Sequence, residues 1–320
     1  MKIAFVADPL SSFNTKKDST YAMMVEAAAR GHALYCLQPE DLAWKRNRVF
    51  GAMCPLTVRP DPKHWYSLGV PAETALADLG CVVMRKDPPF DVEYVTSTWL
   101  LEQAQREGAR VFNEPRALRD HSEKFAIAQF SQFVAPTLVS RSTTELQRFI
   151  DEHADVVLKP LDGMGGQSIF RITDSDPNRN VIIETLSVRG GRTVMAQRYI
   201  PEIREGDKRV LVIAGKPVPY CLARIPKPGE SRGNLAAGGT GVARPLAPRD
   251  LQIAEALGPE LARRGLLLVG LDVIGDFLTE INVTSPTCFQ EITQQTGFSV
   301  AGMFMDALEQ ACAGAPWSAS

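Results

Sequence analysis

Cysteine and histidine are scarce in this sequence, and their spacings match no metal or redox motif. The 320 residues include six cysteines and four histidines, with no C-x-x-C pair and no cysteine at ligand spacing from a histidine. We therefore interpret the cysteines as reduced thiols, most of them in the core. No histidine has a nucleophile or a ligand partner at a readable spacing, so a catalytic triad is not expected.

Long apolar runs are also missing. No segment approaches the ~18 consecutive apolar residues that a membrane span needs. The opening MKIAFVADPL becomes charged at Asp8, which is too early for a signal peptide. These two features predict a cytoplasmic protein without a membrane-spanning segment.

An excess of one charge sign is absent as well. The chain carries 35 lysine and arginine residues against 37 aspartate and glutamate residues. This balance gives no long-range field that would favour nucleic acid or an anionic membrane, so neither is expected as a partner. Any anionic ligand must be held by local clusters of charge. The length of the chain suits two or three domains.

The first third of the chain alternates strands and helices, which is typical of a Rossmann-like α/β domain with a parallel sheet. We predict strands at 2–7, 33–37, 81–85 and 110–113, and helices at 18–30 and 92–107. The first strand-helix loop, from Asp8 to Lys17, contains no glycine. The glycine fingerprint of dinucleotide-binding domains is therefore missing, which argues against NAD or FAD.

After residue 120 the pattern changes to an antiparallel α+β arrangement. A capping box at Ser142 begins a helix, and strands are predicted at 155–159, 168–172 and 194–200, with a further helix near 180–187. Two hairpins follow, about Gly215-Lys216 and Gly275-Asp276. Between them, residues 226–241 contain five glycines and two prolines. A loop of that length inside a compact domain indicates either function or disorder.

The last hairpin, LVGLDVIGDFLTEINVTSPT, carries a set of oxygen ligands. If its loop has an odd number of residues, Asp272 lies opposite Glu280, and Asn282 shares their face because strand side chains alternate. The same register collects apolar side chains on the other face, whereas an even loop would mix the two kinds. Two carboxylates and an amide oxygen suit magnesium. A solvated sheet face is the alternative interpretation.

The stretch VVLKPLDGMGGQSIF places a lysine before a glycine-rich turn. Lys159 ends a predicted strand, and Gly163, Gly165 and Gly166 follow it, which is the reverse of the order in a P-loop. Free N–H groups in such a turn can form an anion-binding nest, and the lysine adds a point charge. A plain flexible hairpin turn would explain the loop equally well.

Several other cations have positions that favour ligand binding. A two-residue loop at Gly215-Lys216 would put Arg209 and Arg224 on one sheet face, where each guanidinium group could bind a carboxylate through two hydrogen bonds. Arg85 lies at the carboxyl end of a first-domain strand, where open α/β sheets bind ligands. Lys124 lies in the stretch DHSEK, which opens a helix. Each of these side chains taken alone could be simply solvated.

Together, these residues resemble the ATP-grasp superfamily, and specifically the bacterial glutathione synthetases. The most specific stretches are MRKDPPFD (84–91), LKPLDGMGG (158–166), GDKRVLV (206–212), PVPYCLARIP (217–226), RGNLAAGG (232–239) and LTEINVTSPT (278–287). The resemblance implies a Rossmann-like domain at 1–122, a central ATP-grasp subdomain at 123–200, and a C-terminal subdomain at 201–315 with a lid at 226–241. ATP would lie between two antiparallel sheets.

The resemblance also implies roles for particular residues. The ATP-binding set is Lys124, Lys159, Gly163, Gly165, Gly166, Gln197, Tyr199, Ile200 and Asp207. The metal set is Asp272, Glu280 and Asn282, for Mg²⁺ with Mn²⁺ as the alternative. The substrate set is Arg85, Arg209, Arg224, Asn234, Ser285 and Thr287, and the catalytic set is Arg209, Arg224, Arg232 and Lys159.

The reaction that the resemblance implies is the ATP-dependent joining of γ-glutamylcysteine to glycine through an acyl phosphate, in a homo-oligomer that would be a tetramer. Two alternatives stay open. One is another ATP-grasp carboxylate-amine ligase, either similar to a D-alanine ligase or glutamate-adding. The other is a non-catalytic nucleotide-binding regulator, although no expected metal carboxylate or phosphate lysine is missing from the sequence.

Overall fold

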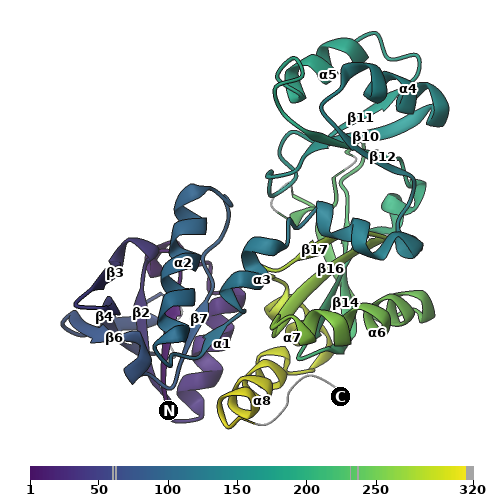
Figure 1. The fold of residues 1–320 in the computed structure, drawn as a ribbon. Helices are drawn as coiled ribbons and strands as arrows, with labels where there is room; N and C mark the ends of the chain where they lie inside the picture. The colour runs from purple at the N-terminus through teal and green to yellow at the C-terminus, as the bar shows by residue number, and fades with distance from the viewer. Residues whose placement is uncertain (60, 62, 231, 236–237, 315–320) are drawn as a thin grey trace.

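The computed structural model describes residues 1–59, 61, 63–230, 232–235 and 238–314. Three sheets organise this part of the chain. Figure 1 shows the N-terminal sheet at the lower left, the middle sheet at the top and the third sheet below it. The middle and third sheets are antiparallel throughout, so the predicted combination of an α/β domain with an α+β region is confirmed.

The N-terminal sheet has a parallel centre in the order β2-β1-β7-β8. These strands are β1 (Lys2–Val6), β2 (Ala33–Leu37), β7 (Cys81–Met84) and β8 (Val111–Phe112). The sequence did not predict the antiparallel extension beside β2, which consists of β3 (Leu42–Lys45), β4 (Arg48–Val58), β5 (Tyr66–Leu68) and β6 (Ala72–Ala75). The sheet is therefore mixed rather than purely parallel.

The two longer helices of this region begin at side-chain caps. Asp18 accepts a hydrogen bond from the Tyr21 N–H at the start of α1 (Ser19–Ala29), at 2.7 Å. Asp91 caps α2 (Val92–Arg106) in the same way. Short helices complete the region: α3 (Pro115–Asp120) and the 3₁₀ segments η1 (Leu10–Ser12), η2 (Pro39–Asp41) and η3 (Leu76–Asp78).

The middle sheet has the order β11-β10-β12-β9. Its strands are β9 (Thr137–Ser140), β10 (Asp155–Pro160), β11 (Phe170–Thr173) and β12 (Val194–Arg198), and α4 (Thr143–His153) and α5 (Arg179–Leu186) pack on it. Ser142 caps α4 by accepting from the Glu145 N–H. Strand β11 begins two residues later than predicted and β12 ends two residues earlier, because residues 168–169 and 199–200 belong to the adjoining loops.

The third sheet has the order β15-β14-β13-β16-β17. Its strands are β13 (Asp207–Ile213), β14 (Lys216–Ile225), β15 (Thr240–Pro245), β16 (Leu268–Ile274) and β17 (Phe277–Asn282). One face packs on α6 (Pro248–Arg263) and η4 (Phe125–Phe133), while α7 (Phe289–Thr296) and α8 (Val300–Cys312) cover part of the other. The short η5 (Pro201–Glu205) joins the middle sheet to this one.

The uncovered part of that second face carries charge. Along β13, Asp207 and Arg209 share a face with Leu211 and Ile213, because strand side chains alternate. Leu211 and Ile213 pack in the apolar cluster with α7 and α8. The same face is thus apolar beneath the helices and charged where it looks toward the middle sheet.

The β16–β17 hairpin has the predicted register, but its turn differs from the predicted one. Asp272 does lie opposite Glu280, and Gly270 lies opposite Asn282. The predicted odd loop is wrong, however, because Ile274 pairs with Phe277 across a two-residue turn. A β-bulge in β17, opposite the step from Asp272 to Val273, supplies the extra residue, Thr279, instead.

The β13–β14 hairpin also turns one residue earlier than predicted, at Ala214-Gly215, because Ile213 pairs with Lys216. Both turn residues have positive φ, as a tight hairpin turn requires. A shift of register further along the hairpin then leaves Asp207 opposite Arg224. Arg209 and Arg224 therefore lie on one face, as predicted.

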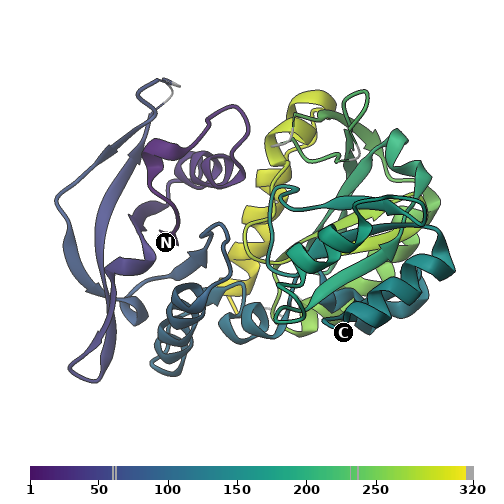
Figure 2. The same ribbon diagram turned by 90° about the horizontal axis from the view of Figure 1, so that it is seen from above.

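The N-terminal domain is fastened to the third sheet by buried hydrogen bonds. The Asn113 side chain donates to the carbonyls of Leu268 and Val283, at 2.9 and 2.8 Å, and accepts from the Leu268 N–H. Figure 2 shows α8 between the N-terminal region and the third sheet, and Arg30, just after α1, forms an ion pair with Asp306 of α8. The two parts are therefore joined by specific contacts.

All six thiols are free. Only Cys81, Cys221 and Cys288 are fully buried, so the interpretation of the cysteines as mostly core residues holds for half of them. No helix in the described part of the chain is both long and apolar enough to cross a membrane.

Packing of α6 against the β13–β14 turn generates a stability prediction. A Cβ atom added at Gly258 would lie 2.3 Å from the Gly215 carbonyl oxygen. We expect Gly258→Ala to lower the free energy of unfolding by about 1–3 kcal/mol, even though alanine normally favours a helix over glycine. Urea denaturation measures the change. The exposed control Glu255→Ala should stay within about 0.5 kcal/mol of wild type, and equal stability of the two variants would contradict the prediction.

Candidate active site

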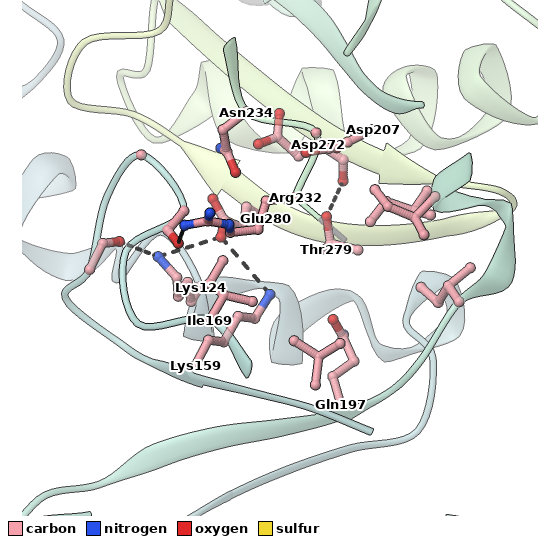
Figure 3. Close-up of a pocket in the computed structure, with 18 of the residues that line it drawn as sticks. Lys124, Lys159, Ile169, Gln197, Asp207, Arg232, Asn234, Asp272, Thr279 and Glu280 are labelled. Carbon is pink, nitrogen blue, oxygen red and sulfur yellow. Dashed lines mark hydrogen bonds and ion pairs between the residues drawn. The ribbon is translucent and has the colours of Figure 1, made fainter. Parts of the chain in front are cut away.

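A cleft lies between the middle sheet and the charged face of the third sheet (Figure 3). All nine residues of the predicted ATP-binding set line it: Lys124, Lys159, Gly163, Gly165, Gly166, Gln197, Tyr199, Ile200 and Asp207. Arg232, Asn234, Asp272 and Glu280 line it as well. The fold thus brings together residues separated by more than 150 positions in the sequence.

Two buried lysines meet Glu280 in this cleft. Lys159 projects from β10, and its ammonium lies 3.9 Å from the Glu280 carboxylate. Lys124, which immediately precedes η4, lies 3.4 Å from the same carboxylate and donates to the Gly163 carbonyl at 2.5 Å. Figure 3 shows both lysines pointing at Glu280. Burial lowers the pKa of the Lys159 ammonium, and the Glu280 charge opposes that shift.

The glycine turn after Lys159 approaches the segment that follows β14. Gly165 and Gly166 both have positive φ, which strains residues with a Cβ atom. A Cβ at Gly166 would also lie 2.8 Å from the Asn234 side-chain oxygen, and Arg232 donates to the Gly166 carbonyl at 3.3 Å. Residues 231, 236 and 237 of the predicted lid lie outside the described residues.

A buried ion-pair network holds the charged face of the third sheet. Arg209 donates to both oxygens of Asp272, at 2.5 and 3.0 Å. Arg224 bridges Asp272 and Asp207, at 2.9 and 2.5 Å. Burial alone would raise the pKa of the Asp272 carboxyl, but the two guanidinium groups together hold it well below its usual range. Two predicted substrate arginines are therefore tied to a predicted metal ligand.

Asp207 has one carboxylate oxygen without a protein partner. Its Oδ2 pairs with Arg224, whereas its Oδ1 is buried and unpaired in the described structure. Burial raises the pKa of Asp207 to about 7, with Asp272 adding to the rise and Arg224 opposing it. A buried unpaired acceptor in a cleft is suited to a donor group of a ligand, such as a hydroxyl.

The predicted metal ligands supply oxygen atoms but no complete metal cage. Asp272 and Glu280 lie opposite each other on β16 and β17, and Asn282 uses its side-chain N–H to bind the Gly270 carbonyl, which leaves its amide oxygen for another contact. Among the described residues, no group of three or more histidine, cysteine, aspartate or glutamate side chains is placed to hold a metal. The oxygen atoms of Asp272, Glu280 and Asn282 suit a hard cation that is also coordinated by phosphate oxygens.

Part of the predicted substrate set lies away from the cleft. Arg85 is buried at the end of β7, where it donates to the Thr20 hydroxyl at 3.0 Å and to the Pro286 carbonyl at 2.9 Å. It thereby reaches the loop between Ser285 and Thr287. Among the described residues, no carboxylate lies within ion-pair distance of Arg85, and burial lowers the pKa of its guanidinium.

Sequence reasoning missed the apolar lining of the cleft and one stacked pair. Val157 and Ile274 lie two positions from Lys159 and Asp272, so strand alternation could have found them. The guanidinium carbon of Arg171 lies 3.7 Å from the centre of the Tyr199 ring, and Asp155 holds Arg171 through two hydrogen bonds. No local pattern indicates that stack.

Two family models match most of the chain. The model of the prokaryotic glutathione synthetase N-terminal domain matches residues 1–119, and the model of the ATP-grasp domain of the same enzymes matches residues 123–297. The chain belongs to the prokaryotic glutathione synthetase family. It is therefore an ATP-dependent ligase, and the predicted family resemblance is confirmed.

Individual relatives in the glutathione synthetase family cover nearly the whole chain. Glutathione synthetase from Ralstonia nicotianae is 62% identical over 97% of this chain and 96% of its own length. That from Nitrosomonas europaea is 61% identical, with 97% and 98% covered. Among solved structures, a D-cycloserine synthetase shares the fold with a TM-score of 0.67 at 16% identity, covering 98% of this chain and 100% of its own.

The buried network generates a prediction about stability. Arg209→Met removes two of the hydrogen bonds to the buried Asp272 carboxylate, so we expect the free energy of unfolding to fall by about 3–5 kcal/mol. The double variant with Asp272→Asn should recover much of that loss, because no buried charge is then left without its partner. Arg263→Ala, which breaks an exposed pair with Glu260, should cost less than about 1 kcal/mol. Denaturation curves of the three variants are compared, and similar losses for Arg209→Met and Arg263→Ala would refute the assignment.

Proposed function

We propose that the chain joins γ-glutamylcysteine to glycine, with ATP converting the cysteinyl carboxylate to an acyl phosphate. The observation that carries the proposal is the convergence of Lys124, Lys159 and Glu280, from three separate segments, on one cleft. Lys159 of the middle sheet faces the carboxylates of the third sheet across the cleft, and Lys124 joins them from the start of η4. Membership of the glutathione synthetase family supports the choice of substrates.

Binding of ATP is assigned to the nine residues that line the cleft. Lys124, Lys159 and the N–H groups of the glycine turn would hold the phosphates, because cations and nests of N–H groups favour anions. The backbone of Gln197 to Ile200 would contact the adenine. The unpaired Oδ1 of Asp207 supports a hydrogen bond to a ribose hydroxyl.

Magnesium, or manganese in its place, is assigned to Asp272, Glu280 and Asn282. Two carboxylates and one amide oxygen are a donor set that Mg²⁺ accepts when phosphate oxygens and water complete its coordination. The cation would supply neutralisation of the charge that develops on the phosphates. The residues of the chain hold and orient this donor set: Arg209 and Arg224 fix Asp272, and the two lysines fix Glu280.

The dipeptide substrate is assigned to Arg85, Arg209, Arg224, Asn234, Ser285 and Thr287. Arg85 is the best supported of these, since a buried guanidinium without a carboxylate partner in the described structure is suited to an anionic ligand group. Its contact with the Pro286 carbonyl joins it to the loop that carries Ser285 and Thr287. A substrate carboxylate would complete the ion pair.

No protein nucleophile is required for the chemistry. A carboxylate oxygen of γ-glutamylcysteine attacks the γ-phosphate of ATP, ADP leaves, and an acyl phosphate forms. The amine of glycine then attacks the acyl carbon, gives up a proton and expels phosphate, which leaves the new amide bond. Lys159, Arg209, Arg224 and Arg232 would act by positioning the reactants and by neutralising charge. Since acyl phosphates hydrolyse, exclusion of water from the cleft would protect the intermediate.

Larger-scale features of the family are proposed on the resemblance alone. The domain borders are 1–122, 123–200 and 201–315, with a lid at 226–241 that closes over the phosphates. The contact of Arg232 with the glycine turn supports a lid at that position. Residue 315 and three lid residues lie outside the described chain. The enzyme would act as a cytoplasmic homotetramer.

One assay tests the reaction. With ATP, Mg²⁺ and γ-glutamylcysteine, we expect phosphate release that rises strongly when glycine is added, and formation of a tripeptide detected by mass spectrometry. D-Alanine or glutamate in place of glycine should support much less product. Product formation with either alternative at the rate seen for glycine would overturn the substrate assignment, and no release dependent on γ-glutamylcysteine would overturn the reaction.

A second prediction concerns the proposed metal ligand Glu280. Glu280→Gln keeps the size of the side chain but removes its charge, and a neutral amide binds Mg²⁺ more weakly than a carboxylate. We expect turnover to fall about 100-fold or more, on the scale of losing one charge-stabilising contact, while circular dichroism stays unchanged. The surface control Glu255→Gln should retain full turnover. Wild-type turnover in Glu280→Gln would remove this residue from the site.

A further inference from the structure

Glu123 links the segment before η4 to the end of β17 through four hydrogen bonds. Its backbone carbonyl accepts from the Ile281 N–H at 2.8 Å. One carboxylate oxygen, Oε1, accepts from the N–H groups of Val283 and Thr284, at 2.9 and 3.0 Å, and from the Thr284 hydroxyl at 2.8 Å. Glu123 therefore accepts hydrogen bonds from three residues that lie about 160 positions later in the sequence.

These contacts surround Asn282 without touching its side chain. The N–H groups of Ile281 and Val283, on either side of it, both bind Glu123, and Asn113 holds the Val283 carbonyl. Strand β17 ends at Asn282, so no further ladder hydrogen bonds would fix the backbone beyond it. Glu123 supplies this restraint at the point where regular pairing stops.

The same short segment also enters the cleft. Lys124, the next residue, reaches the Gly163 carbonyl and the Glu280 carboxylate. Displacement of Glu123 would therefore disturb the lysine and the strand end together. Tyr94 lies near the carboxylate and is buried, and burial together with the Glu123 charge raises the pKa of its phenol. The hydrogen bonds that the Glu123 carboxylate accepts are themselves partly buried, and partial exclusion of water strengthens them.

We propose that Glu123 is a positioning residue, which holds the backbone on both sides of Asn282 so that the Asn282 amide oxygen faces the metal and nucleotide. The proposal rests on the assignment of Asn282 as a metal ligand under Proposed function. Glu123 itself contacts neither substrate nor metal in this role. It acts through the strand end in the way that outer partners orient the ligands of other metal sites.

The test compares Glu123→Ala with Glu123→Gln and with a matched control. The control is Glu107→Ala, because Glu107 also accepts a backbone N–H, from Val49 at 2.8 Å, but lies in the N-terminal domain. Binding of Mn²⁺ in the presence of ADP is followed by electron paramagnetic resonance of the free ion. Hydrogen exchange of the 281–284 backbone amides and steady-state kinetics are measured on the same full-length proteins.

We expect Glu123→Ala to weaken Mn²⁺ binding about 10-fold to 100-fold and to speed exchange at Val283 and Thr284. The Mg²⁺ concentration for half-maximal turnover should rise by a similar factor. Glu123→Gln keeps an acceptor oxygen and should recover most of the affinity. Glu107→Ala should bind Mn²⁺ like wild type, even if it unfolds at a lower temperature.

Two outcomes separate this inference from the function on which it rests. Normal Mn²⁺ affinity in Asn282→Ala would contradict the metal assignment itself. Normal affinity in Glu123→Ala, beside a weakened Asn282→Ala, would overturn the positioning role alone. Equal weakening in Glu107→Ala would also overturn it, because the effect would then follow general stability rather than the strand end.

Discussion

The burial of four charged side chains on one sheet face is the constraint on which the rest of this structure depends. Asp207, Arg209, Arg224 and Asp272 form a connected set of ion pairs away from solvent. Such a set is costly to desolvate, and its own attraction does little more than offset that cost. The stability of the sheet must therefore come from its apolar opposite face and from the helices α6, α7 and α8.

The arrangement explains why the third sheet is covered unevenly. Helices α7 and α8 cover the apolar end of the charged face, and the remaining end is left for the middle sheet and the ligand. The Asp272 carboxylate, held between Arg209 and Arg224, stays ionised and keeps its orientation before any ligand arrives. Preorganised charge of this kind needs little rearrangement when phosphates bind, which is the main source of rate enhancement in phosphoryl transfer.

The predictable parts of the site were those that leave a local pattern. Alternation of apolar residues placed Asp272 opposite Glu280, and the expected two-residue turn of the other hairpin set Arg209 and Arg224 on one face, because side chains alternate along a strand. The turn that produces this register was predicted wrongly, since a bulge and an odd loop change parity in the same way. The two possibilities, a bulge or an odd loop, differ only in which backbone groups of the two strands are hydrogen-bonded to each other. That pairing cannot be read from one strand alone.

Long-range contacts account for what the sequence could not show. Glu123 stood in a quoted stretch beside Lys124, yet its partners are at Val283 and Thr284 and no spacing connects them. The extension β3–β6 was missed for a related reason: β4 pairs with β2, β3, β5 and β6, and these partners are not specified by the composition of any one segment. In both cases the pairing belongs to the fold as a whole.

The bulge in β17 has a consequence for how this part of the chain can vary between relatives. Thr279 donates to the Asp272 carbonyl, and it is the residue by which the strand shifts register. Loss of Thr279 alone would remove the bulge and make the Val273–Leu278 and Asp272–Glu280 pairs consecutive in one regular ladder, so Glu280 and Asn282 would keep their face. The length of this segment is therefore less constrained than its chemistry: a single-codon deletion at the bulge would remove the Thr279 hydrogen bond but would leave the two faces of the strand unchanged.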